Sequence, residues 1–439
     1  MSVQRYLSGE SAVKIAASVE EALSAGRASA GDALPPVRTL ATHLSVSPAT
    51  VASAYRLLQE RGIAVADGRR GTRLRRVSPA LPASQAALPR GVRDLATGNP
   101  DIALLPDIDA ALARLRPGRR LYGSELNHPP LVELARRQFD DDGIDAAHVA
   151  VVSGAMDGLE RALREHLRAG DRVIVEDPCF TGTLDLLNAL SLTPVPVPVD
   201  DEGLAPAGLR QALGGTVGAL IVTPRAQNPT GAALSERRAR QLRALLRARP
   251  ELHVIEDDHA GPVAGAPYRS IATDRERWAV VRSVAKSLGP DLRVALVAGD
   301  ARTLARVEGR QNLGVRWVSH ILQQLVVALW RDKAVQKQLA AAARTYTQRR
   351  DALVSALRDR GIAAHGASGL NVWIPLREEA SVVNALLQRG WAVNAGERYR
   401  LRSGPAIRVT VAALPVDDAV RFADDVVEIV FGTRRASIS

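Results

Sequence analysis

Apolar residues at helical spacing mark the beginning of the chain. Ile15, Val19 and Leu23 recur every four residues, which predicts a helix over residues 12–25. A second helical pattern covers residues 34–41, whose two prolines can occupy only the first turn of a helix. The chain therefore opens with at least two short helices.

A third helix is predicted to follow Ser47 and Pro48, because serine is a good N-cap and proline a good first helical residue. Its apolar pattern continues to Gly62. Residues 63–66 and 71–74 have the pattern of two strands joined by an Asp-Gly turn. Two short helices joined by a tight turn and followed by a hairpin form a winged helix-turn-helix.

A different pattern occupies the rest of the chain. Residues 77–93 contain three prolines among small residues and have neither helical nor strand periodicity, so they read as a linker. Beyond residue 94, short apolar strands alternate with amphipathic helices, which predicts an α/β fold with a mostly parallel sheet covered on both faces. A smaller α+β subdomain is predicted at about 344–439. The expected organisation is a winged helix-turn-helix at 1–76, the linker, and a large domain at 94–439.

Composition agrees with a protein of several domains. The 439 residues exceed one ordinary hydrophobic core, and the 46% hydrophobic and 24% charged fractions are close to globular averages. The single cysteine, Cys179, cannot form an internal disulfide. The sequence shows neither an export signal nor an apolar run of membrane-spanning length. These features indicate a cytoplasmic protein that has no membrane partner.

The charge distribution favours a polyanionic partner for the N-terminal region. Residues 1–76 contain eleven Arg and Lys against six Asp and Glu, an excess of five positive charges. The whole chain carries a net charge of +11, so a general arginine-rich composition explains much of that excess. Charge by itself decides little here.

The run PPVRTLATHLSVSPATVASAYRLLQERG, followed by DGRRGT, resembles the winged helix-turn-helix of the GntR family over about residues 10–76. The resemblance implies that the partner is double-stranded DNA and that Arg38 contacts it. Ser47, Thr50 and Ser53 share one face of the third helix, where they can meet bases and phosphates, although capping or packing is an alternative role for Thr50. The implied wing contacts are Arg69, Arg70, Gly71 and Thr72.

A second candidate site follows from the lysines, because a cofactor that condenses with an amine requires one. The chain has four, Lys14, Lys286, Lys333 and Lys337. Lys14 lies in the first predicted helix, and the last two have the spacing of a solvated helix face. Lys286 instead follows an apolar strand, with Ser283 three residues before it and Arg293 seven after it. An amine, a hydroxyl and a guanidinium suit a phosphorylated aldehyde.

Two further motifs lie at predicted strand ends, where α/β folds place ligands. PRAQNPTG occupies residues 224–231 and EDDH occupies 256–259. Together with Lys286 they resemble the fold-type I pyridoxal 5′-phosphate (PLP) enzymes of the aspartate aminotransferase superfamily, over about residues 94–435. The resemblance implies PLP as the cofactor, with a pyridine ring that a carboxylate keeps protonated.

The same resemblance implies a role for each matching residue. Lys286 would form the Schiff base and Asp257 would pair with the pyridine nitrogen, with Asp258 as the alternative. Ser283 and Arg293 would hold the phosphate, and Arg408 would receive a substrate carboxylate. The remaining implied contacts are the backbone amides of Gly154, Ala155 and Met156 on the phosphate, Phe180 stacked on the ring, Asn228 on the phenolate oxygen, and Tyr122 on the phosphate of the partner subunit.

Position 259 departs from the family pattern. Related regulators usually have a tyrosine there that bonds the cofactor phenolate, whereas this chain has His259, whose imidazole replaces that bond or loses it. A metal site at residues 256–259 is not expected, because consecutive strand residues point to alternate faces and cannot converge on one ion.

A GntR-type module joined to an aminotransferase-like domain is the architecture of the MocR subgroup. The EDDHAGP and RSVAKSLGPDLR segments look closest to the PtsJ-type regulators of vitamin B6 metabolism. This implies a homodimeric transcription regulator whose large domain senses PLP or an amino compound, by a shift between two dimer geometries. The alternatives are an active PLP-dependent aminotransferase with a regulatory DNA module, and a DNA-binding protein whose large domain is a cofactor-free dimerisation scaffold.

Overall fold

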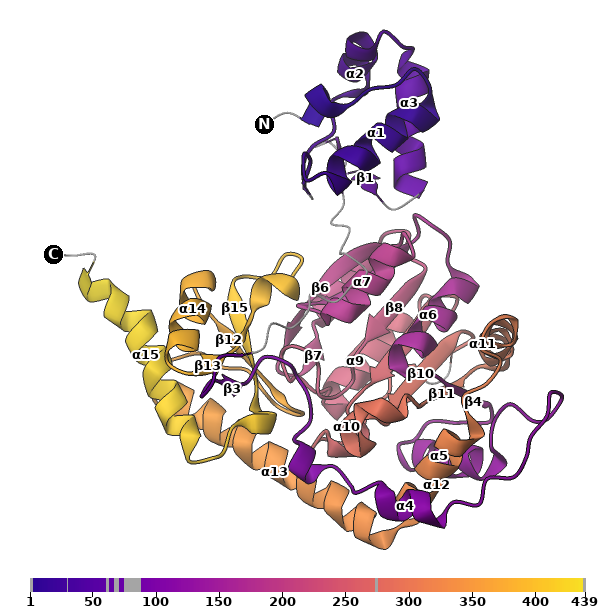
Figure 1. Cartoon of the computed structure of the whole chain (residues 1–439), viewed down its shortest axis with the longest axis vertical. Helices are drawn as coiled ribbons and strands as arrows, with labels where there is room; N and C mark the ends of the chain where they lie inside the picture. The colour runs from indigo at the N-terminus through magenta and orange to yellow at the C-terminus, as the bar shows by residue number, and fades with distance from the viewer. Residues whose placement is uncertain are drawn as a thin grey trace. The chain divides into compact units, whose positions relative to one another are not determined.

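A computed structural model describes residues 3–29, 31–60, 63–66, 71–74, 88–272 and 275–436 (Figure 1). The chain divides into two compact units, one of Met1–Ala86 with Leu167–Val173 and Gly182–Pro194, and the other of Ala87–His166, Ile174–Thr181 and Val195–Ser439. We call Met1–Ala86 the N-terminal unit and the rest of the chain the large unit. Each unit has its own hydrophobic core. No helix among the described residues is both long enough and apolar enough to cross a membrane.

The N-terminal unit has the elements of a winged helix-turn-helix. They are η1 (Val3–Tyr6), α1 (Ala12–Ser24), α2 (Val37–Leu44), α3 (Pro48–Glu60), β1 (Ala64–Ala66) and β2 (Thr72–Leu74). The two strands pair antiparallel, and the helices share a core that includes Ile15, Leu40 and Leu58. The second helix begins at Val37, later than the predicted Leu34, because a residue that precedes a proline avoids the helical conformation.

A mixed eight-stranded sheet forms the centre of the large unit. Its strands are β4 (Val149–Val152), β5 (Arg172–Asp177), β6 (Thr193–Asp200), β7 (Gly203–Leu204), β8 (Ala219–Val222), β9 (His253–Asp258), β10 (Trp278–Ser283) and β11 (Ala295–Gly299). The order across the sheet is β4-β11-β10-β9-β8-β5-β6-β7. The strands β8, β9 and β10 run parallel, whereas β11 is antiparallel to both neighbours. The prediction of a mostly parallel sheet is confirmed, with antiparallel strands near its edges.

Helices alternate with these strands along the chain. They are α4 (Asp109–Arg114), α5 (Pro129–Asp141), α6 (Ala155–His166), α7 (Thr181–Ala189), α8 (Pro206–Leu213), α9 (Glu236–Leu246), α10 (Ala285–Leu288), α11 (Ala301–Leu313), α12 (His320–Arg331) and α13 (Lys333–Arg358). Gly158 of α6 lies against Val281 on one face of the sheet. The adjacent residue Val280 faces the opposite side and shares a core with Leu242 of α9. Both faces of the sheet are therefore covered.

A smaller layer with its own core completes the large unit. It contains β12 (Asn371–Pro375), α14 (Ala380–Gln388), β13 (Trp391–Ala392), β14 (Asn394–Ala395), β15 (Ala406–Thr410) and α15 (Asp418–Ala436). We call residues 359–436 the small subdomain. Helices α13 and α15 lie side by side (Figure 1). Strand β3 (Arg93–Asp94) pairs in parallel with β13, so a segment almost 300 residues away in sequence completes this layer. The sequence patterns did not indicate that pairing.

Candidate functional site

Lys286 lies in the short helix α10, directly after β10. Its Nζ donates a hydrogen bond to the Gly98 carbonyl at 2.7 Å. Burial, and next the nearby Arg408 charge, lower the pKa of Lys286 to about 8. About a tenth of the amine is thus neutral at pH 7, and the neutral amine is the form that attacks a carbonyl.

Two neighbouring carboxylates at the end of β9 have opposite environments. Asp258 accepts hydrogen bonds from Arg225 Nε at 2.9 Å and from Arg282 Nε at 2.7 Å. Burial would raise the pKa of Asp258, but these two guanidinium groups hold it well below its usual range. Asp257 is also buried, and its Oδ1 has no hydrogen-bond partner among the described residues. Burial, and next the Asp258 charge, raise the pKa of Asp257 to about 7.

This contrast separates a structural carboxylate from an available one. Asp258 is fully occupied by Arg225 and Arg282, so it anchors β9 to its neighbours. An unpartnered carboxylate oxygen in the interior costs free energy unless a ligand satisfies it. Asp257 is therefore the carboxylate that can receive a protonated ring nitrogen.

The beginning of α6 faces Arg293. Gly154 has a φ of +94°, a backbone conformation that favours glycine, and a Cβ on it would lie 2.9 Å from Arg293 Nη2. Arg293 Nη2 donates to the Ser153 carbonyl at 3.3 Å. Ala155 and Met156 form the first turn of α6, whose free amides attract anions. Ser283 is buried at the end of β10, where its Oγ accepts from the Ala285 amide at 3.1 Å.

Arg408 of β15 is the main cationic group that the small subdomain contributes. It is only 3% exposed, and within the described ranges no carboxylate lies at ion-pair distance from it. Its Nη1 donates to Asn228 Oδ1 at 3.3 Å, its Nη2 donates to the Ala96 carbonyl, and its guanidinium lies over the Tyr399 ring. A buried guanidinium without an acid partner can bind a carboxylate ligand in a bidentate pair.

Phe180 is half-buried at the end of the turn that follows β5. The small subdomain holds this turn in place. Asp177 accepts hydrogen bonds from the backbone amides of residues 401–403 at 2.8–2.9 Å, and the Cys179 amide donates to the Tyr399 carbonyl at 2.7 Å. The sequence reasoning missed Asp177 and Tyr399, because the contacts join segments more than 200 residues apart.

Two predicted cofactor contacts, His259 and Tyr122, have other partners within this chain. His259 Nε2 is 2.8 Å from the Ala226 carbonyl oxygen, so the imidazole bonds to the backbone. Tyr122 is 78% exposed and stacks edge-to-face on Trp317, with ring centroids 5.6 Å apart. Within one chain, Tyr122 does not contribute to the cluster around Lys286.

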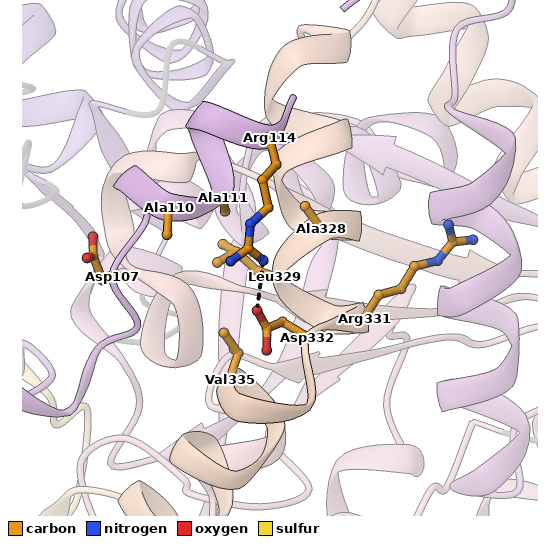
Figure 2. Close-up of a pocket in the computed structure, with 9 residues that line it drawn as sticks. All are labelled: Asp107, Ala110, Ala111, Arg114, Ala328, Leu329, Arg331, Asp332 and Val335. Atoms are coloured by element: carbon orange, nitrogen blue, oxygen red, sulfur yellow. Dashed lines mark hydrogen bonds and ion pairs between the residues drawn. The ribbon is translucent and has the colours of Figure 1, made fainter. Parts of the chain in front are cut away.

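A separate surface pocket of about 320 Å³ lies between α4 and the junction of α12 with α13 (Figure 2). Arg114 reaches Asp332 across it at 3.5 Å. None of the residues that line it is among the predicted site residues. No cluster of metal-ligating side chains occurs in the part of the chain that the structure describes.

The candidate nucleic-acid interface is exposed. Arg38 lies on the surface of α2. Ser47 caps α3: its Oγ accepts from the Thr50 amide at 3.1 Å and lies 2.9 Å from Thr50 Oγ1. Ser53 is half-buried on the same helix. Gly71 precedes β2 and has a φ of +84°, and Thr72 is the first residue of that strand. Arg69 and Arg70 lie outside the described residues.

Two family models match the chain. The model for aminotransferase class I and II matches residues 90–426, and the model for bacterial regulatory proteins of the gntR family matches residues 11–74.

Similar proteins match most of the sequence. The chain is 40% identical over 425 residues to the vitamin B6 salvage pathway transcriptional repressor PtsJ of Salmonella typhimurium, covering 96% of this chain and 98% of that protein. It is 28% identical over 353 residues to the HTH-type pyridoxine biosynthesis transcriptional regulator PdxR of Corynebacterium glutamicum, covering 75% of each.

Solved structures share the fold of the large unit. The kynurenine aminotransferase of Pyrococcus horikoshii, in complex with PMP, matches with a TM-score of 0.70 and 22% identity, covering 78% of this chain and 91% of that one. The α-aminoadipate aminotransferase LysN of Thermus thermophilus, complexed with N-(5′-phosphopyridoxyl)-L-leucine, matches with a TM-score of 0.70 and 21% identity, covering 80% and 96%.

Proposed function

Since this chain belongs to the GntR-family regulators that carry an aminotransferase class I and II domain, the MocR architecture, we propose that it is a PLP-binding transcriptional regulator of vitamin B6 metabolism. The N-terminal module binds double-stranded DNA. The large domain binds PLP and senses PLP itself or an amino compound. The similarity to a vitamin B6 salvage repressor over almost the whole chain supports the choice of pathway.

One observation carries the cofactor assignment. Asp257 Oδ1 is buried and has no hydrogen-bond partner in the part of the chain that the structure describes, and the other carboxylate at that strand end is already bonded to two arginines. A protonated pyridine nitrogen would donate a hydrogen bond to Asp257. Its positive charge would lower the raised pKa of Asp257, so that the carboxylate is ionised at neutral pH. Gly154 lies close to Arg293, so the backbone amides at the beginning of α6 and the Arg293 guanidinium can bind the cofactor phosphate together.

PLP supplies an aldehyde that condenses with amines and a ring that accepts electrons. Lys286 provides the amine in a partly neutral form. Arg293, Ser283 and the first turn of α6 bind the phosphate. Asn228 donates to the phenolate oxygen, and Phe180 stacks on the ring. Arg408 binds the carboxylate of an amino compound.

A homodimer accounts for Tyr122. Tyr122 is 78% exposed and the adjacent Leu121 is 80% exposed, so the two side chains form an apolar surface that a partner subunit would cover. In the proposed dimer Tyr122 reaches the phosphate bound by the partner subunit. Cofactor binding at a site shared by two subunits would then bias the geometry of the dimer and hence of its DNA modules.

Borohydride reduction tests the cofactor assignment. Reduction of the PLP-treated protein should fix the cofactor to a peptide that contains Lys286, and Lys286→Ala should abolish the labelling. Lys333→Ala and Lys337→Ala are matched controls that should label like the parent. Labelling at Lys14, Lys333 or Lys337 would refute the assignment.

A salt titration tests the DNA assignment. Arg38→Ala, and Arg69→Ala with Arg70→Ala, should weaken DNA binding and reduce the slope of log K against log salt by about one for each phosphate that the variant no longer neutralises. Lys14→Ala, an exposed change on α1, is the control. An unchanged slope in the arginine variants would show that they do not touch the DNA backbone.

An active aminotransferase is the second candidate, because Lys286, Asp257 and Arg408 are all retained. A transaminase assay over common amino acids, run beside a DNA-binding titration with and without PLP, separates the two. The regulator is expected to turn over amino acids poorly and to change its DNA affinity with PLP, a response that Lys286→Ala should remove. Rapid turnover with a DNA affinity indifferent to PLP would favour the enzyme.

A further inference from the structure

Ala226 has a strained backbone that is held from both sides. Its φ of +56° is left-handed, which costs a residue with a Cβ about 1–2 kcal/mol. Its amide donates to Ser368 Oγ at 2.6 Å, and its carbonyl accepts from His259 Nε2 at 2.8 Å. All of Ala226 is buried. Such a conformation persists only where the surroundings impose it.

The bond to Ala226 fixes where the His259 proton lies. A carbonyl oxygen only accepts, so Nε2 must carry the hydrogen. Burial, and next the Lys286 charge, lower the pKa of His259 to about 4, although the bond to the Ala226 carbonyl and the Asp258 charge oppose this shift. The imidazole is thus neutral near pH 7 and has one N–H, which is already used. Its Nδ1 has no proton to donate to a cofactor oxygen.

Ser368 brings the small subdomain to the same turn. It belongs to the segment between α13 and β12, and its amide donates to the Gly231 carbonyl at 2.7 Å. A Cβ on Gly369, whose φ is +71°, would lie only 2.4 Å from Ala226 Cβ. Residues 226–231, which include Asn228, are therefore clamped between the end of β9 and the small subdomain.

We propose that His259 is a positioning residue: its Nε2–H donates a hydrogen bond to the Ala226 carbonyl instead of the cofactor. Together with Ser368, it couples the small subdomain to the turn that presents Asn228. Of positions 228 and 259, only Asn228 donates to the phenolate oxygen. A movement of the small subdomain changes that hydrogen bond through Ala226. The inference rests on the proposed binding of PLP. It specifies which residue donates to the phenolate oxygen and how a movement of the small subdomain changes that hydrogen bond.

The proposal predicts a spectroscopic effect. A donor to the phenolate oxygen stabilises the form in which the nitrogen linked to Lys286 has lost its proton, because that form places more negative charge on the oxygen. Removal or misplacement of the Asn228 hydrogen bond therefore raises the pH midpoint of the cofactor absorbance change. One hydrogen bond corresponds to about 0.5–1 pH unit.

The test compares His259→Phe, Ser368→Ala, the double variant and His259→Gln in an absorbance titration of the PLP-loaded protein. Both single changes should raise the midpoint, and their effects should be less than additive because both act through Ala226. His259→Gln keeps a donor for the Ala226 carbonyl and should stay near the parent. His148→Phe, a change at an exposed histidine, is the control.

Different results would overturn the coupling and the proposed function. A midpoint raised by His259→Phe but unchanged by Ser368→Ala would mean that His259 contacts the cofactor directly, and unchanged midpoints in both would remove the coupling. Failure of the parent to bind PLP would refute the proposed function instead. In that case hydrogen exchange of the peptide spanning residues 224–232 in the cofactor-free protein decides the coupling. Both single variants should exchange faster there, and unchanged protection would overturn the inference.

Discussion

The two candidate sites of this chain are built in opposite ways. In the large unit the polar groups are buried and are held by contacts between distant segments, as between Lys286 and Gly98, 188 positions apart. On the N-terminal unit, Arg38 and Ser47 are exposed, and the Ser47 contacts span three residues. A substitution in the buried site can therefore break bonds between distant segments and cost much stability, whereas a substitution on the exposed face removes only local contacts and should cost little stability.

The largest effect is expected at Asp258. Asp258→Ala leaves Arg225 and Arg282 buried without their carboxylate, which should lower the free energy of unfolding by about 3–5 kcal/mol. Asp257→Asn is the matched variant, because Asp257 Oδ1 has no hydrogen-bond partner among the residues that the structure describes. It should change the stability of the cofactor-free protein by less than about 1 kcal/mol but abolish most of the thermal stabilisation by PLP. Denaturation with and without PLP measures both, and similar behaviour of the two variants would contradict the assignment.

A smaller effect is expected from pH. The pKa of Lys286 is lowered to about 8, so its reactive neutral form increases as the pH rises through 8. The rate of covalent PLP attachment, followed by absorbance, should increase about tenfold between pH 7 and pH 9. Arg408→Gln removes a positive charge that lowers the pKa of Lys286, so it should move the midpoint to higher pH. A rate independent of pH in this range would show that deprotonation of Lys286 does not limit attachment.

The smallest effect is expected on the exposed helix. Ser47→Ala removes the N-cap of α3 and should lower the stability of the N-terminal unit by about 1 kcal/mol, together with some DNA affinity. Ser53→Ala makes the comparison, since the capping hydrogen bonds remain, and it should change DNA affinity with little effect on the melting temperature. If the two variants destabilised the protein equally, the distinction between capping and DNA contact would fail.

Much of the fold could be predicted because its signals are local. Helical spacing at Ile15 and Val19, the cap at Ser47 and the βα alternation depend on neighbouring residues, so they are visible without a structure. The antiparallel strand β11 and the pairing of β3 with β13 were not visible. Pairing partners that lie far apart in sequence leave no periodic signal of their own.

The candidate site likewise combines features that the sequence shows with features that only the folded chain shows. The sequence singled out Lys286 among four lysines and left the choice between Asp257 and Asp258 open. The difference between these carboxylates comes from Arg225 and Arg282, which only the folded chain brings to Asp258. His259 could be recognised as unusual, but its bond to Ala226 required the geometry.

The sequence by itself determined the two-part organisation, the helices with their caps, and the small set of residues that could perform amine chemistry, because these follow from residue type and spacing. The tertiary structure decided which of those residues are desolvated, which are already bonded, and which remain available to a ligand. Burial sets the direction of the pKa shift of Asp257 and His259, and nearby charges and hydrogen bonds outweigh burial at Asp258. These surroundings come largely from segments that meet only when the chain folds.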